Sequence, residues 1–264
     1  MKQQIATFIA ARPSPPAWKV RFELAHSPQP GMYVLADLGE TVRTPLFPTS
    51  IDESGFDTIV PPGHPATRLL PGTQVDVLGP QGHGFEVDAN RLLLIADVEH
   101  LPLLIPLLDR AASVAVIVEA MTRLQLPSPT IFPPNVELIM VTLDGSLGYL
   151  GPLESLDPAA MGFVRASSVL KELLICAEQV CLALHAVRYP DLAAIVYKTR
   201  LNPQSNFAQA IIHCPMPCGA GVCDICNITT KLGEKHVCID GPVFNLLHLH
   251  KESENQQPPQ KLDA

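Results

Sequence analysis

Short runs in which apolar and polar residues partly alternate follow one another through the first third of the chain. Alternation with a period of two is typical of β-strands that bury one face. Turns rich in proline and glycine separate the runs, such as Pro28 to Gly31 and Pro71-Gly72. The strands expected on this basis are Gln4–Arg12, Trp18–His26, Met32–Leu38, Leu46–Asp52 and Gln74–Leu78. Short strands at this spacing predict a small antiparallel β-barrel over residues 1–89.

From about Arg91 the pattern changes to continuous apolar runs. Such runs are typical of strands that are buried on both faces of a parallel sheet. The expected elements are strands at Leu92–Asp97, Val114–Val118, Val136–Val141, Leu173–Cys176 and Ala194–Tyr197, and helices at Leu101–Ala112 and Val180–Val187. Buried strands that alternate with helices predict a parallel-sheet α/β domain over residues 90–205.

Cysteines gather after this second domain. The chain has seven cysteines, and five of them fall between Cys214 and Cys238. We therefore expect a small cysteine module over residues 206–250. Residues 251–264 are polar and rich in Gln and Pro, a composition that predicts a disordered tail.

Charge and hydropathy exclude several classes of partner. The net charge is −8, which argues against nucleic acid because phosphates require a basic face. The richest apolar run, Leu92 to Leu108, is interrupted by Asp97, Glu99 and His100, so we expect no membrane insertion. The apolar segment Ile5 to Ala11 is too short for a secretory signal. We expect a cytoplasmic protein, in which a reducing environment disfavours disulfides.

The spacing of four cysteines carries the most specific chemistry. Cys218-Gly-Ala-Gly-Val-Cys223-Asp-Ile-Cys226 is followed by Cys238, and this is the plant-type [2Fe–2S] spacing. Such a loop must turn its thiolates inward and its backbone N–H groups toward sulfur, and Gly219 and Gly221 allow the required positive φ angles.

Zinc is the alternative metal for these cysteines. Structural zinc sites usually combine two C-x-x-C pairs, whereas this chain has only Cys223 and Cys226 at that spacing. Cys214 is either a spare ligand or a small buried residue. Cys176 and Cys181 are interpreted as core residues.

At this point the chain resembles a known family. The cysteine loop and the later run Val237-Cys238-Ile-Asp240-Gly-Pro-Val-Phe244 resemble the electron-transfer subunit of NAD-linked dihydroorotate dehydrogenases, within the ferredoxin-reductase superfamily. The segments Gly72 to Phe85 and Asp144 to Gly151 are also similar to that family. The resemblance implies a flavin-binding barrel, a nicotinamide-binding α/β domain and a [2Fe–2S] module, in the order read from the chain.

The flavin motif departs from the family pattern. Where the family has Arg-Pro-x-Ser-Ile, this chain reads Phe47-Pro-Thr-Ser-Ile51, so the arginine that would pair with cofactor phosphates is absent. The family's Gly-x-Gly-Thr reads His64-Pro-Ala-Thr67, and proline lacks a backbone donor. The resemblance implies FAD on the barrel, with these contact positions: Pro48, Thr49, Ser50, Val60 and Thr67.

The nicotinamide motifs depart further. In place of the family's glycine-rich turn the chain reads Ala96-Asp-Val-Glu-His100-Leu-Pro-Leu, which sets carboxylates against an anionic pyrophosphate. The family's Cys-Gly-Pro motif is matched to Cys176-Ala-Glu178. We therefore expect no productive NAD(P)H binding. Asp97, Glu99 and His100 are interpreted as a solvated loop at a strand end, with a charged docking surface as the alternative.

Three functions are consistent with these patterns. The first is an electron-transfer subunit, rather than an autonomous enzyme, whose cluster relays electrons to or from other redox subunits of a hetero-oligomeric complex. The second is a functional NADH-linked electron-transfer subunit of dihydroorotate dehydrogenase. The third is a structural or assembly subunit of a larger redox complex with an idle cluster. The fold is common to all three and does not discriminate among them.

Overall fold

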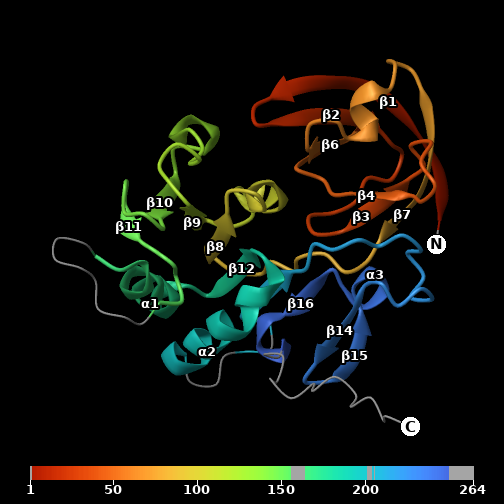
Figure 1. The fold of residues 1–264 in the computed structure, drawn as a ribbon. Helices are drawn as coiled ribbons and strands as arrows, with labels where there is room; N and C mark the ends of the chain where they lie inside the picture. The colour runs from red at the N-terminus through yellow and green to blue at the C-terminus, as the bar shows by residue number, and fades with distance from the viewer. Residues whose placement is uncertain (1, 156–163, 201–203, 205, 250–264) are drawn as a thin grey trace, which may run out of the picture.

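The first part of the chain forms one antiparallel sheet of seven strands. A computed structural model of the chain describes residues 2–155, 164–200, 204 and 206–249. The sheet has the order β4-β3-β7-β1-β2-β6-β5, and Figure 1 shows it curled on itself. Its strands are β1 (Gln3–Ser14), β2 (Ala17–Glu23), β3 (Tyr33–Ala36), β4 (Thr44–Leu46), β5 (Ser50–Asp52), β6 (Gly55–Val60) and β7 (Gln74–Gln81). The 3₁₀-helix η1 (Pro65–Arg68) lies between β6 and β7.

The alternation seen in the sequence determines which side chains the curled sheet buries. Along β7 every second residue is buried, so Val75 and Val77 face the core. Phe22 lies at the centre of this core, with its ring 5.8 Å from the rings of both Phe8 and Phe56. The expected antiparallel architecture is thus confirmed, but the predicted strand Leu46–Asp52 was wrong because it joins the end of β4 to β5, and β6 was not predicted.

The second sheet is parallel except for one edge strand. Its order is β11-β10-β9-β8-β12-β13-β16, and only β16 runs antiparallel to its neighbour. The strands are β8 (Arg91–Asp97), β9 (Ser113–Ala120), β10 (Val136–Thr142), β11 (Tyr149–Leu150), β12 (Gln179–Ala183), β13 (Ala208–Ile211) and β16 (Val243–Asn245). Helices α1 (Ala166–Cys176) and α2 (Tyr189–Thr199) pack side by side (Figure 1). This confirms the predicted α/β class.

Three elements of this domain were assigned wrongly from the sequence. Leu173–Cys176 and Ala194–Tyr197 are not strands but parts of α1 and α2, and Val180–Val187 is not a helix because β12 occupies its first half. Short apolar runs do not distinguish a buried strand from a buried helix. The deciding signal was the helical spacing of Leu170 and Leu174, which are buried while the residues between them are less so.

The predicted helix Leu101–Ala112 is replaced by two short 3₁₀-helices. These are η2 (Leu101–Leu103) and η3 (Ile105–Leu107), and each carries a proline in its first turn. Pro106 lacks the N–H that a continuous α-helix beginning at Leu101 would need at that position, whereas Pro102 falls in the first turn, where no such bond is made. Two further 3₁₀-helices lie in other connections: η4 (Pro129–Ile131) between β9 and β10, and η5 (Ala186–Arg188) between β12 and α2.

The cysteine-rich segment forms a small module beside both sheets (Figure 1). It contains the hairpin β14 (Asn227–Thr230) and β15 (Gly233–His236), then the single helical turn α3 (Val237–Asp240). The chain then enters the α/β sheet as β16 and ends its described part with η6 (Leu246–His248). The predicted tail, 251–264, lies outside the described residues. Within the described parts of the chain, no helix is both long and apolar enough to cross a membrane.

Candidate metal centre

The four predicted cysteine ligands come together in two pairs. The thiols of Cys218 and Cys223 interact within the loop that precedes β14. The thiol of Cys226 interacts with that of Cys238, which the turn α3 brings in from a distant part of the module. Cys226 and Cys238 are buried, whereas Cys218 and Cys223 are half-buried.

Backbone N–H groups point at these sulfur atoms. The N–H of Gly221 donates to Cys238 Sγ at 3.2 Å, and the N–H of Ala220 donates to Cys218 Sγ at 3.4 Å. The Ala220 donor, with further N–H groups of Val222 and Cys223, lowers the pKa of Cys218 to about 6. Burial raises the pKa of Cys238 to about 12. The loop therefore favours a thiolate at Cys218, and thiolates are the form that binds metals.

The loop reaches this shape through left-handed backbone conformations. Gly219 and Gly221 have φ angles of +60° and +69°, and Asp224 has +54°. A Cβ at Gly221 would lie 2.7 Å from Ile239 Cδ1, so that side chain would have to shift, and the positive φ itself favours glycine there. Asp224 Oδ1 lies 2.7 Å from His236 Nε2, which ties the loop to the end of β15.

The arrangement of the four thiols suits a cluster with two irons. Within the described part of the chain, no three His, Cys, Asp or Glu side chains form a group that could hold one metal ion. Two thiol pairs suit a [2Fe–2S] cluster, in which each iron takes two protein ligands. Backbone N–H groups that donate hydrogen bonds to the sulfur atoms stabilise the negative charge of such a cluster.

The other cysteines have different surroundings. Cys214 is half-buried, and burial together with the neighbouring Cys226 raises its pKa to about 11, so its thiol stays protonated. Cys181 is completely buried in β12, as expected of a core residue. Cys176 is exposed at the end of α1, so its assignment to the core was wrong.

The predicted flavin contacts lie around the ends of β5, β6 and η1. Thr49 donates from both its N–H and its hydroxyl to the carbonyl of Asp57, at 2.8 and 3.2 Å. Thr67 does the same toward the carbonyl of His64, at 2.9 and 2.7 Å. Pro48 and Val60 are buried and Ser50 is exposed. The threonine donors thus have partners inside the protein, and these positions contribute no charged group to a phosphate.

The residue that stands in place of the flavin-motif arginine belongs to a row of aromatic rings. The Phe47 ring lies 5.6 Å from that of Tyr33 and 5.5 Å from that of His213. His213 in turn lies 5.8 Å from His100. The row joins the first sheet to the carboxyl end of β8.

The segment after β8 is more buried than expected. His100 is only 8% exposed, and its Nδ1 lies 2.8 Å from Asp97 Oδ1, so the interpretation of this residue as part of a solvated loop was wrong. The signal in the sequence was the spacing of three between Asp97 and His100, which allows the carboxylate to cap the turn and to hold the ring.

An ion-pair network occupies the same edge of the sheet. Glu119 is the second-last residue of β9 and accepts from Arg188 Nη1 at 2.5 Å, although it is only 4% exposed. Arg188 also binds the Glu154 carboxylate with two nitrogens, at 2.8 and 2.6 Å. In open α/β sheets, ligands bind at the carboxyl ends of the strands. In this structure the side chains of Glu119, Arg188 and Glu154 occupy the space at the carboxyl ends of the strands.

The match of Cys176-Ala-Glu178 to a nicotinamide motif was wrong in its placement. The N–H of Glu178 donates to the carbonyl of Arg91, the first residue of β8, whereas Asp97 is the last. The two segments therefore lie at opposite ends of the sheet strands, the first at the amino end and the second at the carboxyl end. Leu184 and His185, not Cys176, follow the carboxyl end of β12.

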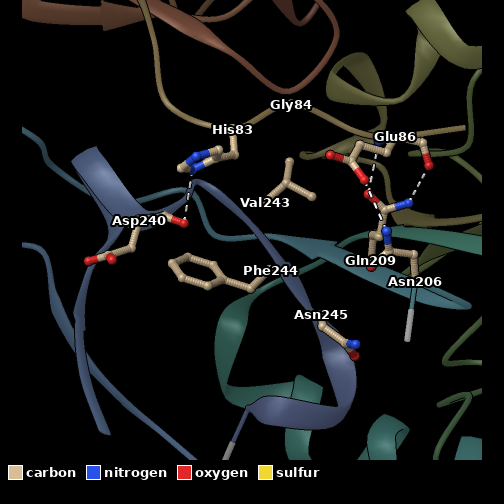
Figure 2. Close-up of a pocket in the computed structure, with 9 residues that line it drawn as sticks. All are labelled: His83, Gly84, Glu86, Asn206, Gln209, Asp240, Val243, Phe244 and Asn245. Atoms are coloured by element: carbon tan, nitrogen blue, oxygen red, sulfur yellow. Dashed lines mark hydrogen bonds between the residues drawn. The ribbon is translucent and has the colours of Figure 1, made fainter. Parts of the chain in front are cut away.

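Figure 2 shows a groove of about 280 Å³ next to the cysteine module. Its wall is a set of paired polar groups: Glu86 exchanges two backbone hydrogen bonds with the buried amide of Gln209, and its carboxylate accepts from Asn206. The Phe244 ring lies between Asp240 and Val243 (Figure 2). The groove is lined by His83, Gly84, Glu86, Asn206, Gln209, Asp240, Val243, Phe244 and Asn245. Sequence reasoning did not find it, because its residues come from three distant segments.

Comparison with known proteins agrees with this geometry. The family described as the iron-sulfur cluster binding domain of dihydroorotate dehydrogenase B matches residues 215–249. The chain is 26% identical over 238 residues to the probable dihydroorotate dehydrogenase B (NAD(+)), electron transfer subunit, of Thermoplasma acidophilum, covering 88% of this chain and 85% of that protein. It is 28% identical over 243 residues to the corresponding subunit of Geobacillus thermodenitrificans, covering 84% and 86%.

The chain is similar over most of its length to electron transfer subunits of dihydroorotate dehydrogenase B. Solved structures support the same fold. An NADH-dependent reduced ferredoxin-NADP oxidoreductase superposes with a TM-score of 0.67 at 18% identity, covering 92% of this chain and 88% of that one. The CS-b5R domains of human Ncb5or give 0.57 at 14% identity, covering 79% and 69%. At these identities they show the ferredoxin-reductase-like fold alone.

Proposed function

We propose that the chain is an electron-transfer subunit in which Cys218, Cys223, Cys226 and Cys238 hold a [2Fe–2S] cluster. The observation that carries this proposal is that the four thiols form two pairs, Cys218 with Cys223 and Cys226 with Cys238. Backbone N–H groups donate hydrogen bonds to Cys218 Sγ and Cys238 Sγ. The match of residues 215–249 to an iron-sulfur cluster binding domain supports it. When bound, such a cluster supplies one-electron transfer.

The partner is another redox subunit that docks on the face of the cysteine module. Apolar side chains directly beside the proposed ligands point to this face. Val222 is 78% exposed next to Cys223, Ile225 is 60% exposed next to Cys226, and Ile239 is 47% exposed next to Cys238. Exposed apolar side chains gathered around a redox centre are typical of a protein interface. The relatives are themselves described as subunits for electron transfer.

FAD on the barrel belongs to the same proposal. The supporting observations are the ferredoxin-reductase-like fold and the position of Thr49, Ser50 and Thr67 at the ends of barrel elements. Pro48 and Val60 would supply apolar contacts. Because no arginine is present in the motif, we expect FAD to be held less tightly than where a guanidinium pairs with the phosphates.

Electrons enter or leave through the partner rather than from NAD(P)H. The carboxyl edge of the sheet holds the Glu119–Arg188–Glu154 network, and Asp97 stands where glycine would let backbone approach a pyrophosphate. All seven cysteines are free thiols, which suits a reducing compartment such as the cytoplasm.

The test is the absorption spectrum of the full chain, purified without oxygen and then mixed with NADH. We expect dithionite to bleach the cluster bands and NADH to leave them unchanged. Rapid bleaching by NADH would instead favour a conventional NADH-linked subunit. In the assembled complex, unchanged electron flux after loss of the cluster in a Cys226→Ser variant would favour a structural role.

A further inference from the structure

The barrel contributes a buried tyrosine to the cysteine site. Tyr33 lies in β3 and has no exposed surface. Its hydroxyl donates to the backbone carbonyl of Cys238 at 2.9 Å, although the two residues are 205 positions apart. The same hydroxyl lies 3.4 Å from Gln81 Oε1, at the end of β7. A residue of the flavin-type barrel is therefore bonded directly to a proposed cluster ligand.

The cysteine loop rests on the same part of the barrel. A Cβ at Gly219 would lie 2.4 Å from Leu35 Cδ1 and 2.9 Å from Gln81 Oε1, so the loop backbone is in direct contact with both side chains. Tyr33, Leu35 and Gln81 come from the adjacent strands β3 and β7. These three residues, called here the barrel floor, support the loop at Gly219 and hold the peptide of Cys238.

We propose that Tyr33 is a positioning residue for the iron–sulfur site: with Gln81 it fixes the Cys238 peptide against the barrel and thereby sets how firmly the cluster is held and how readily it is reduced. This rests on the proposed function, because it needs a cluster on the four cysteines. The residue acts through Cys238 and does not itself ligate metal.

The position of the hydroxyl gives it an effect on charge. Tyr33 is fully buried, and its hydroxyl lies 2.9 Å from the carbonyl oxygen of Cys238. Because it donates this hydrogen bond, the hydroxyl presents its O–H dipole to the carbonyl of a ligand residue. An oriented O–H near the site stabilises the added negative charge of a reduced cluster, since reduction potentials depend on local hydrogen bonds and charge.

The test compares Tyr33→Phe with Tyr189→Phe in the full chain purified without oxygen. Tyr189 is a matched control because it is also fully buried, and its hydroxyl donates to the backbone carbonyl of Ile211 at 2.5 Å. For Tyr33→Phe we expect a more negative midpoint potential by dithionite titration. We also expect cluster loss to a chelator to be faster by about two- to tenfold, the range of one net hydrogen bond. Tyr189→Phe should leave the potential unchanged.

A Tyr33→Phe protein with the wild-type potential and the wild-type rate of cluster loss would overturn the inference. If this variant does not fold, Gln81→Leu keeps the tyrosine and removes the second acceptor of its hydroxyl; a shift in potential supports the inference, and no shift overturns it. A wild-type chain without acid-labile sulfide would overturn the proposed function itself, and the inference with it. The failure of the inference is distinguishable from the failure of the proposed function, because only the former can be observed in a wild-type chain that contains its cluster.

Discussion

The seven cysteines of the chain have different surroundings, and these surroundings determine the chemistry of each thiol. Cys218 and Cys223 are half-buried in a loop whose N–H groups face sulfur, and Cys226 and Cys238 close the site from the buried side. Cys181 is fully buried in β12, and this burial raises its pKa. The grouping of the four proposed ligands could be predicted from the sequence because they lie close together along the chain. The state of Cys214 could not, because it depends on burial.

Replacing one buried ligand should remove the cluster, whereas replacing an outlying cysteine should not. We expect Cys226→Ser to lose nearly all of its bound iron and acid-labile sulfide, because a buried hydroxyl is a poor substitute for a thiolate ligand. Cys176→Ser is the matched control, since it makes the same change at an exposed position. Iron and sulfide assays on both proteins check this. Equal cluster content in the two variants would contradict the ligand assignment.

Asp97 should make stability depend on pH. Burial raises its pKa, but the hydrogen bond and charge of His100 outweigh burial and hold the pKa below its ordinary value. A carboxyl with a depressed folded-state pKa stabilises the fold above its unfolded pKa of about 3.9, and this contribution is lost as pH falls through the lower folded value. We expect Asp97→Asn to lower the free energy of unfolding by about 1.5–3 kcal/mol near neutral pH, as for a hydrogen bond to a charged group.

Urea unfolding of wild type and Asp97→Asn between about pH 6 and about pH 3 measures this effect. The difference between the urea midpoints of wild type and Asp97→Asn should become smaller as the pH falls toward about pH 3. A gap that stays constant over this range would show that the charge of Asp97 does not contribute.

At the scale of elements, the sequence predicted strands better than helices. The barrel strands alternate with a period of two, and the structure keeps that alternation in β7. Between Ala166 and Thr199 the apolar runs are short, and periodicity alone placed strands where α1 and α2 lie. Pro106 lies inside the predicted helix Leu101–Ala112, and the structure has two short 3₁₀-helices there instead. Local composition fixes a period only when a run is long enough to show it.

The seating of the cysteine loop on the barrel can be tested with a pair of glycines. Gly219→Ala introduces a Cβ that would lie 2.4 Å from Leu35 Cδ1, so the loop must move away from the barrel floor. Gly63→Ala is the control: its φ is +81°, but no atom lies within 4 Å of the added Cβ. Both variants should lose about 1–2 kcal/mol of stability from the left-handed backbone.

Only Gly219→Ala should also lose iron: after a chelator challenge it should retain at least about tenfold less iron than wild type. A displaced loop weakens cluster binding by more than the loss of one hydrogen bond would. The measurement is iron content after equal exposure to chelator. Retention of iron by Gly219→Ala would mean that the loop does not depend on the barrel floor.

At the scale of the whole molecule, the barrel and the module meet around Tyr33 and Cys238. The order of the parts could be predicted along the chain, but their contact could not, since it joins residues 205 positions apart. The α/β domain adds the aromatic row through His213 and His100 on the same side. The edge where such a sheet binds dinucleotides is filled by Arg188 and its two glutamates. Homology, fold and site together describe an electron relay that faces a partner.

The central claim is that four cysteines hold a [2Fe–2S] cluster, and the most direct measurement is quantification of iron and acid-labile sulfide in the full chain purified without oxygen. An electron paramagnetic resonance spectrum after dithionite reduction completes it. The account predicts about two irons and about two sulfides per chain, with the signal of a single reduced [2Fe–2S] centre. About one zinc per chain with no labile sulfide would contradict it.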